Sequence, residues 1–108
     1  MVKTKDQVEK AIKALVAAVS QDYRITQVIL FGSYAHGAPT DRSDIDVALV
    51  SPDFSGKAEM EILQYLSRKA MKIDTSLEVV AFTPEELQSP DPRSFSYQIK
   101  AHGTPLAA

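Results

Sequence analysis

Two aspartates stand one residue apart in "SDIDVALV", a stretch that otherwise has the composition of a buried strand. Because side chains alternate between the two faces of a strand, Asp44 and Asp46 should share one face while Ile45 and Val47 take the other. The two aspartate Cα atoms would lie about 6.5 Å apart. Carboxylates this close repel each other, and both stay ionised only when they are hydrated or bound to cations. The pair therefore indicates a Mg²⁺ site, because Mg²⁺ takes one or two carboxylates together with substrate phosphates.

A Gly-Ser pair precedes these acids, and ten residues separate Ser33 from Asp44. Gly32 ends the apolar stretch "ITQVILF" and would let a phosphate approach the backbone closely. The free N–H groups of a following helical turn, together with the Ser33 hydroxyl, could hold the phosphate oxygens. Both motifs also have plainer interpretations. Gly-Ser is a common turn with an N-cap serine, and a lone Asp-x-Asp is common at the exposed start of a strand.

A third carboxylate comes later, in "KIDTSLEVVAF". Glu78 sits between Leu77 and Val79, where an unpaired acid in a buried strand is costly and is therefore more often functional. Asp74 is the alternative, although it is equally typical of a turn at the start of the strand. We prefer Glu78, whose plain interpretation is an exposed position on an edge strand.

The elements that must position these residues follow from hydrophobic spacing and capping signals. Thr4 and Gln7 form a capping box for a first helix with one apolar face. The predicted elements are helix 5–20, strand 25–31, a helical turn at 33–36, strand 44–50, helix 58–70, strand 72–82, a short helix starting at Thr83 and a final helix that includes Phe95 and stops at Gly103. Helices between strands predict an α/β (α+β) fold, a small mixed sheet of three or four strands with helices packed on it.

The chain as a whole has 108 residues, which predicts a single domain over 1–108. It has no cysteine, so disulfides and thiolate metal sites are excluded. The net charge is −2 and the cations are scattered, which disfavours long nucleic acid as a partner. Arg42, Lys69 and Lys72 could reach phosphates but are equally typical of solvated surface. No apolar stretch reaches the roughly 20 residues that span a bilayer and the first residues lack a signal-peptide pattern, so we expect a cytoplasmic protein with no membrane partner.

In this order, the motifs resemble those of the DNA polymerase β-like nucleotidyltransferases, and more narrowly the minimal nucleotidyltransferase (MNT) family of small catalytic domains. That family has an apolar strand, Gly-Ser, a loop, Asp-hydrophobic-Asp-hydrophobic, and a later strand with one more acid between hydrophobic residues. Here the motif reads "ILFGS", "SDIDVAL" and "LEV". The stretches "FGSYAHG", "VAFTPEEL" and "IKAHGTPL" extend the likeness over most of the chain from about Val28 onward.

The resemblance implies a polymerase β-like nucleotidyltransferase fold and a role for each motif. It implies that Gly32 and Ser33 hold the nucleotide triphosphate. It implies that Asp44 and Asp46 bind two Mg²⁺ ions, and that Glu78 completes the second metal site and helps to deprotonate the attacking hydroxyl.

His36 departs from the pattern. It stands where the family usually has Arg, so a fixed positive charge near the phosphates is replaced by a mostly neutral imidazole. In the plainer interpretation, His36 is a partly exposed turn residue.

The activity that the resemblance implies is transfer of a nucleoside monophosphate, with AMP from ATP as the expected case, to a hydroxyl acceptor. Similar small proteins act as antitoxins that adenylylate a tyrosine on a HEPN-type helical toxin, and this is the acceptor we expect. The alternative is a catalytically weak or inactive module that neutralises a HEPN-type partner by binding alone, which His36 favours. A third interpretation is an α/β domain whose acids are incidental. The C-terminal segment with Phe95, Tyr97 and Leu106 could dock on a partner, form a homodimer with a second copy, or pack on the protein's own sheet.

Overall fold

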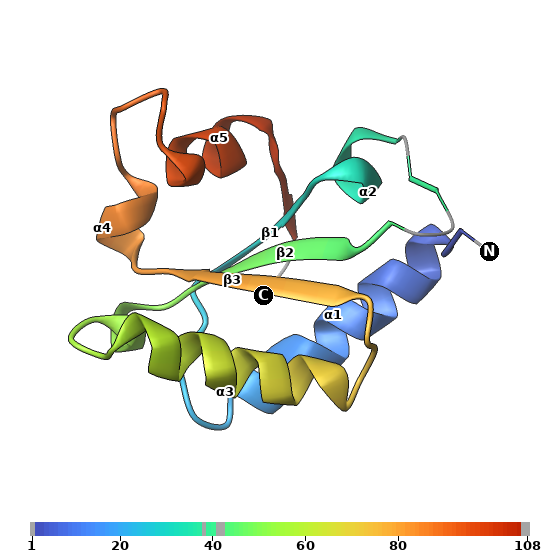
Figure 1. Cartoon of the computed structure of the whole chain (residues 1–108), viewed down its shortest axis with the longest axis horizontal. Coiled ribbons are helices and arrows are strands. Elements are labelled where there is room, and N and C mark those ends of the chain that lie inside the picture. Colours follow the sequence, from blue (N-terminus) through green and yellow to red (C-terminus); the bar gives the residue numbers. More distant parts are fainter. Residues whose placement is uncertain (1, 38, 41–42, 107–108) are drawn as a thin grey trace.

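A four-stranded mixed sheet runs through the middle of the computed structural model, in the order β3-β2-β1-β4 (Figure 1). The structure describes residues 2–37, 39–40 and 43–106, so Arg42, one of the cations considered above, lies outside the described residues. The elements in chain order are α1 (Lys5–Val19), β1 (Gln27–Phe31), α2 (Ser33–His36), β2 (Ile45–Val50), the 3₁₀ turn η1 (Pro52–Phe54), α3 (Glu59–Met71), β3 (Leu77–Phe82), α4 (Pro84–Leu87), α5 (Phe95–His102) and β4 (Thr104–Leu106). This arrangement confirms the predicted fold class.

Helix α1 begins where the capping box predicts. The Thr4 side chain accepts the Gln7 N–H at 3.1 Å, and the Gln7 side chain accepts the Thr4 N–H at 2.8 Å. The buried residues of α1 recur at three- and four-residue spacing, as expected for a helix with one face on a sheet. They are Val8, Ala11, Ile12, Leu15 and Val19.

Strands β2 and β3 are parallel and are connected through α3, whereas β1 runs antiparallel to both β2 and β4. Two parallel strands cannot be joined by a tight turn, which explains why a 13-residue helix lies between them. Helix α3 is held by Ile62, Leu66 and Ala70, which are all buried. This crossover sets the register of β2 against β3 and thereby the relative positions of the acids that they carry.

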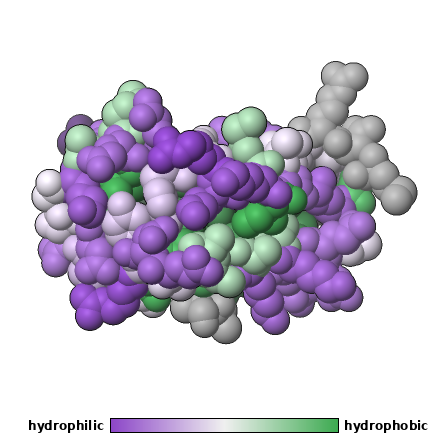
Figure 2. All heavy atoms as spheres, turned by 90° about the horizontal axis from the view of Figure 1, so that it is seen from below, coloured by the Kyte–Doolittle hydropathy of each residue, from purple (hydrophilic) through white to green (hydrophobic). Residues whose placement is uncertain are grey.

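Alternate residues divide the sheet into two faces. The lower face in Figure 1 packs on α1 and α3, and Ile45, Val47 and Leu49 of β2 are fully buried there. Seen from below, the outside of this helical layer is largely hydrophilic, with hydrophobic residues visible in its middle (Figure 2). The lower face is therefore the main hydrophobic core.

The upper face is covered only in part, because α4 and α5 lie over the end where β2 and β3 finish (Figure 1). Ala48 and Val50 of β2 form a second, smaller core there with Leu87 of α4 and Ile99 of α5. The C-terminal segment thus packs on the protein's own sheet, although Phe95, at the start of α5, remains 54% exposed.

Three details differ from the sequence-based expectation. The strand predicted over 72–82 begins only at Leu77, because Asp74 accepts hydrogen bonds from the N–H and the hydroxyl of Ser76 and so forms a turn. Neither η1 nor β4 is predicted, since β4 has three residues including Pro105 and carries no alternating pattern. In the described part of the chain no helix has the length and apolar character to cross a bilayer.

Candidate active site

The pairing of β2 with β3 brings two of the predicted acids together. Asp46 and Glu78 are direct partners in the parallel register of these strands, and paired residues point to the same side of a sheet. Because Ile45 and Val47 are buried on the lower face, Asp46 and Glu78 lie on the upper face. They stand near the beginning of their strands, away from the end that α4 and α5 cover.

Asp44 lies just before β2 and is exposed, as is Glu78, whereas Asp46 is half-buried. Burial raises the pKa of Asp46 above its ordinary value, and the negative charges of Asp44 and then Glu78 raise it further. Asp44 and Glu78 are therefore both close enough to Asp46 to disfavour its ionised form.

The turn with Gly32 and Ser33 lies directly against this acidic group. Phe31, the last residue of β1, is the partner of Asp46 in the antiparallel pair. Gly32 has φ +74°, a left-handed backbone conformation that favours glycine, and a Cβ at this position would overlap the Asp46 carboxylate. Gly32 is thus required both by its backbone conformation and by the space that Asp46 occupies.

Ser33 is the first residue of α2, a short helix bounded by Gly32 and by Gly37, which also has a positive φ of 74°. The N–H groups of Ala35 and His36 donate to the Gly32 carbonyl, which fixes the turn. The first N–H groups of a helix have no partner within the helix, so they are available to an acceptor beside Asp46. The predicted phosphate-binding turn and the predicted acids therefore share one end of the sheet.

Asp74, the alternative third carboxylate, is engaged elsewhere. Its side chain accepts hydrogen bonds from the Ser76 N–H at 2.9 Å and the Ser76 hydroxyl at 2.6 Å, and Lys3 Nζ lies 4.0 Å away. The hydroxyl hydrogen bond, helped by the backbone N–H and by Lys3, lowers the pKa of Asp74. This turn precedes β3, whereas Glu78 faces Asp46 across the strands, which favours Glu78 as the third acid of the site.

The chemistry of the donors suits a hard divalent cation, since carboxylate oxygens are the ligands that Mg²⁺ prefers. Asp46 and Glu78 project from two rigid, paired strands, and Asp44 lies two residues from Asp46. Among the residues that the structure describes, however, no three acidic or histidine side chains converge closely enough to hold a metal ion as they stand. The two exposed members, Asp44 and Glu78, would have to turn toward Asp46. Such rotations cost little at exposed positions, so the residues fit a Mg²⁺ site in type and in placement.

A cavity of about 220 Å³ adjoins Gly32 on the side of α5. Sequence reasoning missed it, because its walls come from segments about 60 residues apart. Beside Gly32 and the exposed His36, its lining includes Gln98 and His102 of α5 and the aromatic rings of Phe31 and Phe95. The two rings meet edge to face, with centroids 5.7 Å apart. No local pattern in the sequence marks Gln98 or His102 as neighbours of the glycine turn.

The chain matches the family model described as "Nucleotidyltransferase domain" over residues 12–101. It is 54% identical over 44 residues to "Putative protein adenylyltransferase MJ0604" of Methanocaldococcus jannaschii, a match that covers 39% of this chain and 44% of that protein. It is 30% identical over 78 residues to "Putative protein adenylyltransferase MJ1379" of the same organism, covering 67% of this chain and 76% of that protein. A third relative, "Putative protein adenylyltransferase MJ0141", is 30% identical over 74 residues, covering 68% and 74%.

One solved structure supports the fold. A crystal structure described as "a putative nucleotidyltransferase from Sulfolobus solfataricus" superposes with a TM-score of 0.62 at 22% identity. The superposition covers 97% of this chain and 89% of the other. The same arrangement of sheet and helices therefore occurs in a protein of known structure.

Proposed function

The chain belongs to the nucleotidyltransferase domain family, and from this premise we propose that it transfers AMP from ATP to a hydroxyl group of another protein. The observation that carries the proposal is the pairing of Asp46 with Glu78 beside the Gly32 turn. Along the chain, the glycine, the aspartates and the glutamate follow the order of the family's motif. Three relatives named as protein adenylyltransferases support AMP as the transferred group and protein as the acceptor.

At the α-phosphorus, the proposed reaction forms one bond and breaks one. The hydroxyl oxygen of the acceptor bonds to the α-phosphorus of ATP, the bond from that phosphorus to the oxygen bridging the β-phosphate breaks, and pyrophosphate leaves. The proton of the hydroxyl passes to a carboxylate. Glu78 suits this role because it is exposed on the edge strand β3, where an acceptor can approach.

Asp44, Asp46 and Glu78 would hold the two Mg²⁺ ions, with Asp46 between the other two acids. Bound Mg²⁺ supplies positive charge that neutralises the phosphates and the leaving pyrophosphate. Burial and the charges of Asp44 and Glu78 raise the pKa of Asp46, and a cation bound among the three carboxylates would offset this repulsion. Gly32 and Ser33 would hold the triphosphate through the N–H groups at the start of α2 and the serine hydroxyl.

We propose a tyrosine of a HEPN-type helical toxin as the acceptor, with this protein as its antitoxin, acting in the cytoplasm. This step rests on the resemblance to minimal nucleotidyltransferase antitoxins. A neighbouring gene that encodes a small all-helical protein with an Arg-x₄-His motif would supply the candidate partner.

The test uses ATP labelled at the α-phosphate, Mg²⁺ and the candidate partner. Wild-type protein should label the partner, and Asp44→Asn and Glu78→Gln should each abolish the labelling. Glu61→Gln is the matched control, because Glu61 is an exposed glutamate on α3 and should be neutral. Labelling that survives Asp44→Asn, or no labelling by the wild type, would refute the proposed transfer.

The second candidate is neutralisation of the partner by binding alone. It is favoured by His36, which provides no fixed positive charge at the exposed end of α2. Calorimetric titration separates the two functions. A protein that binds its partner but neither ATP nor Mg²⁺ would be a binding module, whereas saturable ATP binding that depends on Mg²⁺ and on Asp46 supports the enzyme.

A further inference from the structure

Strand β3 is an open edge of the sheet beside the proposed site. In the described part of the chain β3 pairs with β2 alone, and β4 lies at the opposite edge. At the two ends of the parallel ladder, the carbonyls of Ser76 and Phe82 accept N–H groups from Ile45 and Ser51. Because a strand alternates, the backbone groups of Val79 and Ala81 point the other way, toward the outer edge. This edge has the N–H and C=O groups that an added strand would pair with.

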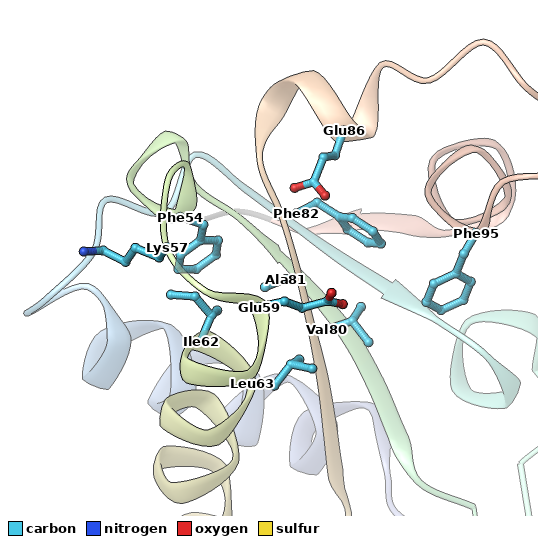
Figure 3. A pocket seen from close by; sticks show the side chains of 10 residues that line it. All are labelled: Phe54, Lys57, Glu59, Ile62, Leu63, Val80, Ala81, Phe82, Glu86 and Phe95. Carbon is cyan, nitrogen blue, oxygen red and sulfur yellow. The ribbon is translucent and has the colours of Figure 1, made fainter.

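A pocket of about 260 Å³ wraps around the same edge (Figure 3). Val80 and Phe82 contribute from the upper face, and Ile62 and Leu63 of α3 contribute from below. Phe95 closes the pocket toward α5, and its ring also lines the cavity next to Gly32. The pocket therefore shares Phe95 with the cavity that adjoins the Gly32 turn.

Two carboxylates point into this pocket. In Figure 3 the Glu59 side chain ends beside Val80 and the Glu86 side chain ends beside Phe82. Glu86 is fixed by its own capping box, in which its carboxylate accepts the Thr83 N–H at 2.8 Å. These acids would repel a nucleotide phosphate, and they would also repel the same edge of a second copy, which brings its own pair.

The third charged residue of the lining is directed elsewhere. Lys57 points away from the pocket in Figure 3, and its ammonium lies 5.9 Å from the centre of the Tyr23 ring. The pocket therefore combines an apolar wall, two carboxylates and aromatic rings. A side chain with an aliphatic stem and a cationic end matches this lining, because the stem can cover the apolar wall while the cation meets the acids.

The pocket is continuous with the acids of the proposed reaction along β3. Val80 follows Glu78 by two residues on the same face, a step of about 6.6 Å, and Phe82 lies about 13 Å from Glu78. A strand added to this edge would present alternate side chains to that face. A residue seated in the pocket and a residue beside Glu78 would therefore be two or four positions apart in the added strand.

We propose that the open edge of β3 binds an extended segment of the acceptor protein. An arginine or lysine of that segment enters the pocket between Glu59 and Glu86, and the hydroxyl residue that receives AMP lies two or four positions away, beside Glu78. This inference rests on the proposed function and names how its acceptor is recognised.

The test uses acetylated, amidated and fluorescently tagged peptides of glutamine and valine that contain one tyrosine, as the only hydroxyl, and one arginine. The tyrosine and the arginine stand two, three or four positions apart in the sequence. A matched set has glutamine in place of arginine. Binding is measured by fluorescence anisotropy, and AMP transfer by the mass gain of each peptide with ATP and Mg²⁺. Peptides with spacings of two or four should bind and be modified about tenfold better than their glutamine counterparts, and the spacing of three should give no such gain.

The protein variants separate the pocket from general acidity. Glu59→Gln with Glu86→Gln should remove the preference for arginine, and glutamine at position 86 still caps α4. Glu61→Gln with Glu85→Gln removes two exposed acids outside the pocket and should leave the preference intact. Transfer or binding that ignores arginine, spacing and the first double variant would overturn the docking proposal while the proposed function stands. Arginine-dependent binding without AMP transfer would support docking and overturn the proposed function.

Discussion

The two faces of the sheet are made from alternate residues of the same strands, yet they differ in what they contribute. On the lower face, Ile45, Val47 and Leu49 are fully buried beneath α1 and α3. On the upper face, Asp46 interrupts the same strand with a charge, and only the far end is covered by α4 and α5. The comparison indicates that stability is concentrated below the sheet and that the candidate site lies above it.

The two faces contribute to the stability of the fold in opposite directions. Burial of an apolar side chain on the lower face stabilises the fold, whereas the raised pKa of Asp46 means that its ionised form is less stable in the folded protein than in the unfolded chain. The upper face therefore holds a destabilising group that the lower face must offset. Substitutions on the two faces should separate stability from activity.

The largest expected effect is that of Asp46→Asn, which should lower AMP transfer by about a thousandfold or more while it raises the melting temperature measured without Mg²⁺. The gain arises because asparagine has nearly the same shape but no charge to be buried or to be repelled by Asp44 and Glu78. It should be greatest near neutral pH. It should disappear below pH 3.8, where the wild-type carboxyl is protonated in both the folded and the unfolded states. A stability that falls in this variant at pH 7 would contradict the proposed repulsion.

Leu66→Ala on the lower face should lower stability and leave activity unchanged, the opposite of Asp46→Asn. Leu66 of α3 is fully buried in the main core, so its truncation leaves a cavity and should lower the free energy of unfolding by about 2–5 kcal/mol. The transfer activity of the folded fraction should be unchanged. Urea unfolding gives the stability, and Val80→Ala on the half-buried upper face is the matched control with a smaller expected loss. A loss below that of the control would mean that the lower face is not the main source of stability.

The smallest expected effect is at Asp74, in the turn before β3. Asp74→Ala removes the hydrogen bonds to Ser76 and should lower stability by about 1 kcal/mol at pH 7. Because these bonds and Lys3 lower the pKa of Asp74, the stabilisation is present above its ordinary value of 3.8 and is lost as the pH falls through the lowered pKa. The difference between variant and wild type, followed by urea unfolding from pH 7 to pH 2, should therefore shrink in acid. AMP transfer equal to that of the wild type would separate Asp74 from the site, and its abolition would restore Asp74 as the third acid.

Much of this arrangement could be predicted from local sequence. The spacing of Val8, Ile12 and Leu15 predicts α1, and the alternation around Asp46 predicts which residues of β2 share a face. The pairing of Asp46 with Glu78 could not be derived in this way, because it depends on the register of two strands joined through α3. Only the resemblance to a family linked these acids before the structure.

Other features have no local signal. Strand β4 is too short to show alternation, and its position beside β1 depends on Gly103, where a Cβ would overlap the Ile29 side chain. The two cavities that share Phe95 are formed by α5 approaching α2 and β3, which is set by packing rather than by pattern. Sequence reasoning could therefore propose the candidate acids but not the walls around them.

Pro105 lies opposite Ile29 in β4, at the margin of the sheet farthest from β3. Proline has no backbone N–H to donate, and a strand of three residues offers few backbone groups with which another strand could pair. Within the described residues, the sheet can thus gain a further strand readily only at its β3 edge. A further strand can pair beside β3, whereas the short, proline-containing β4 disfavours the edge-to-edge stacking of copies into fibres.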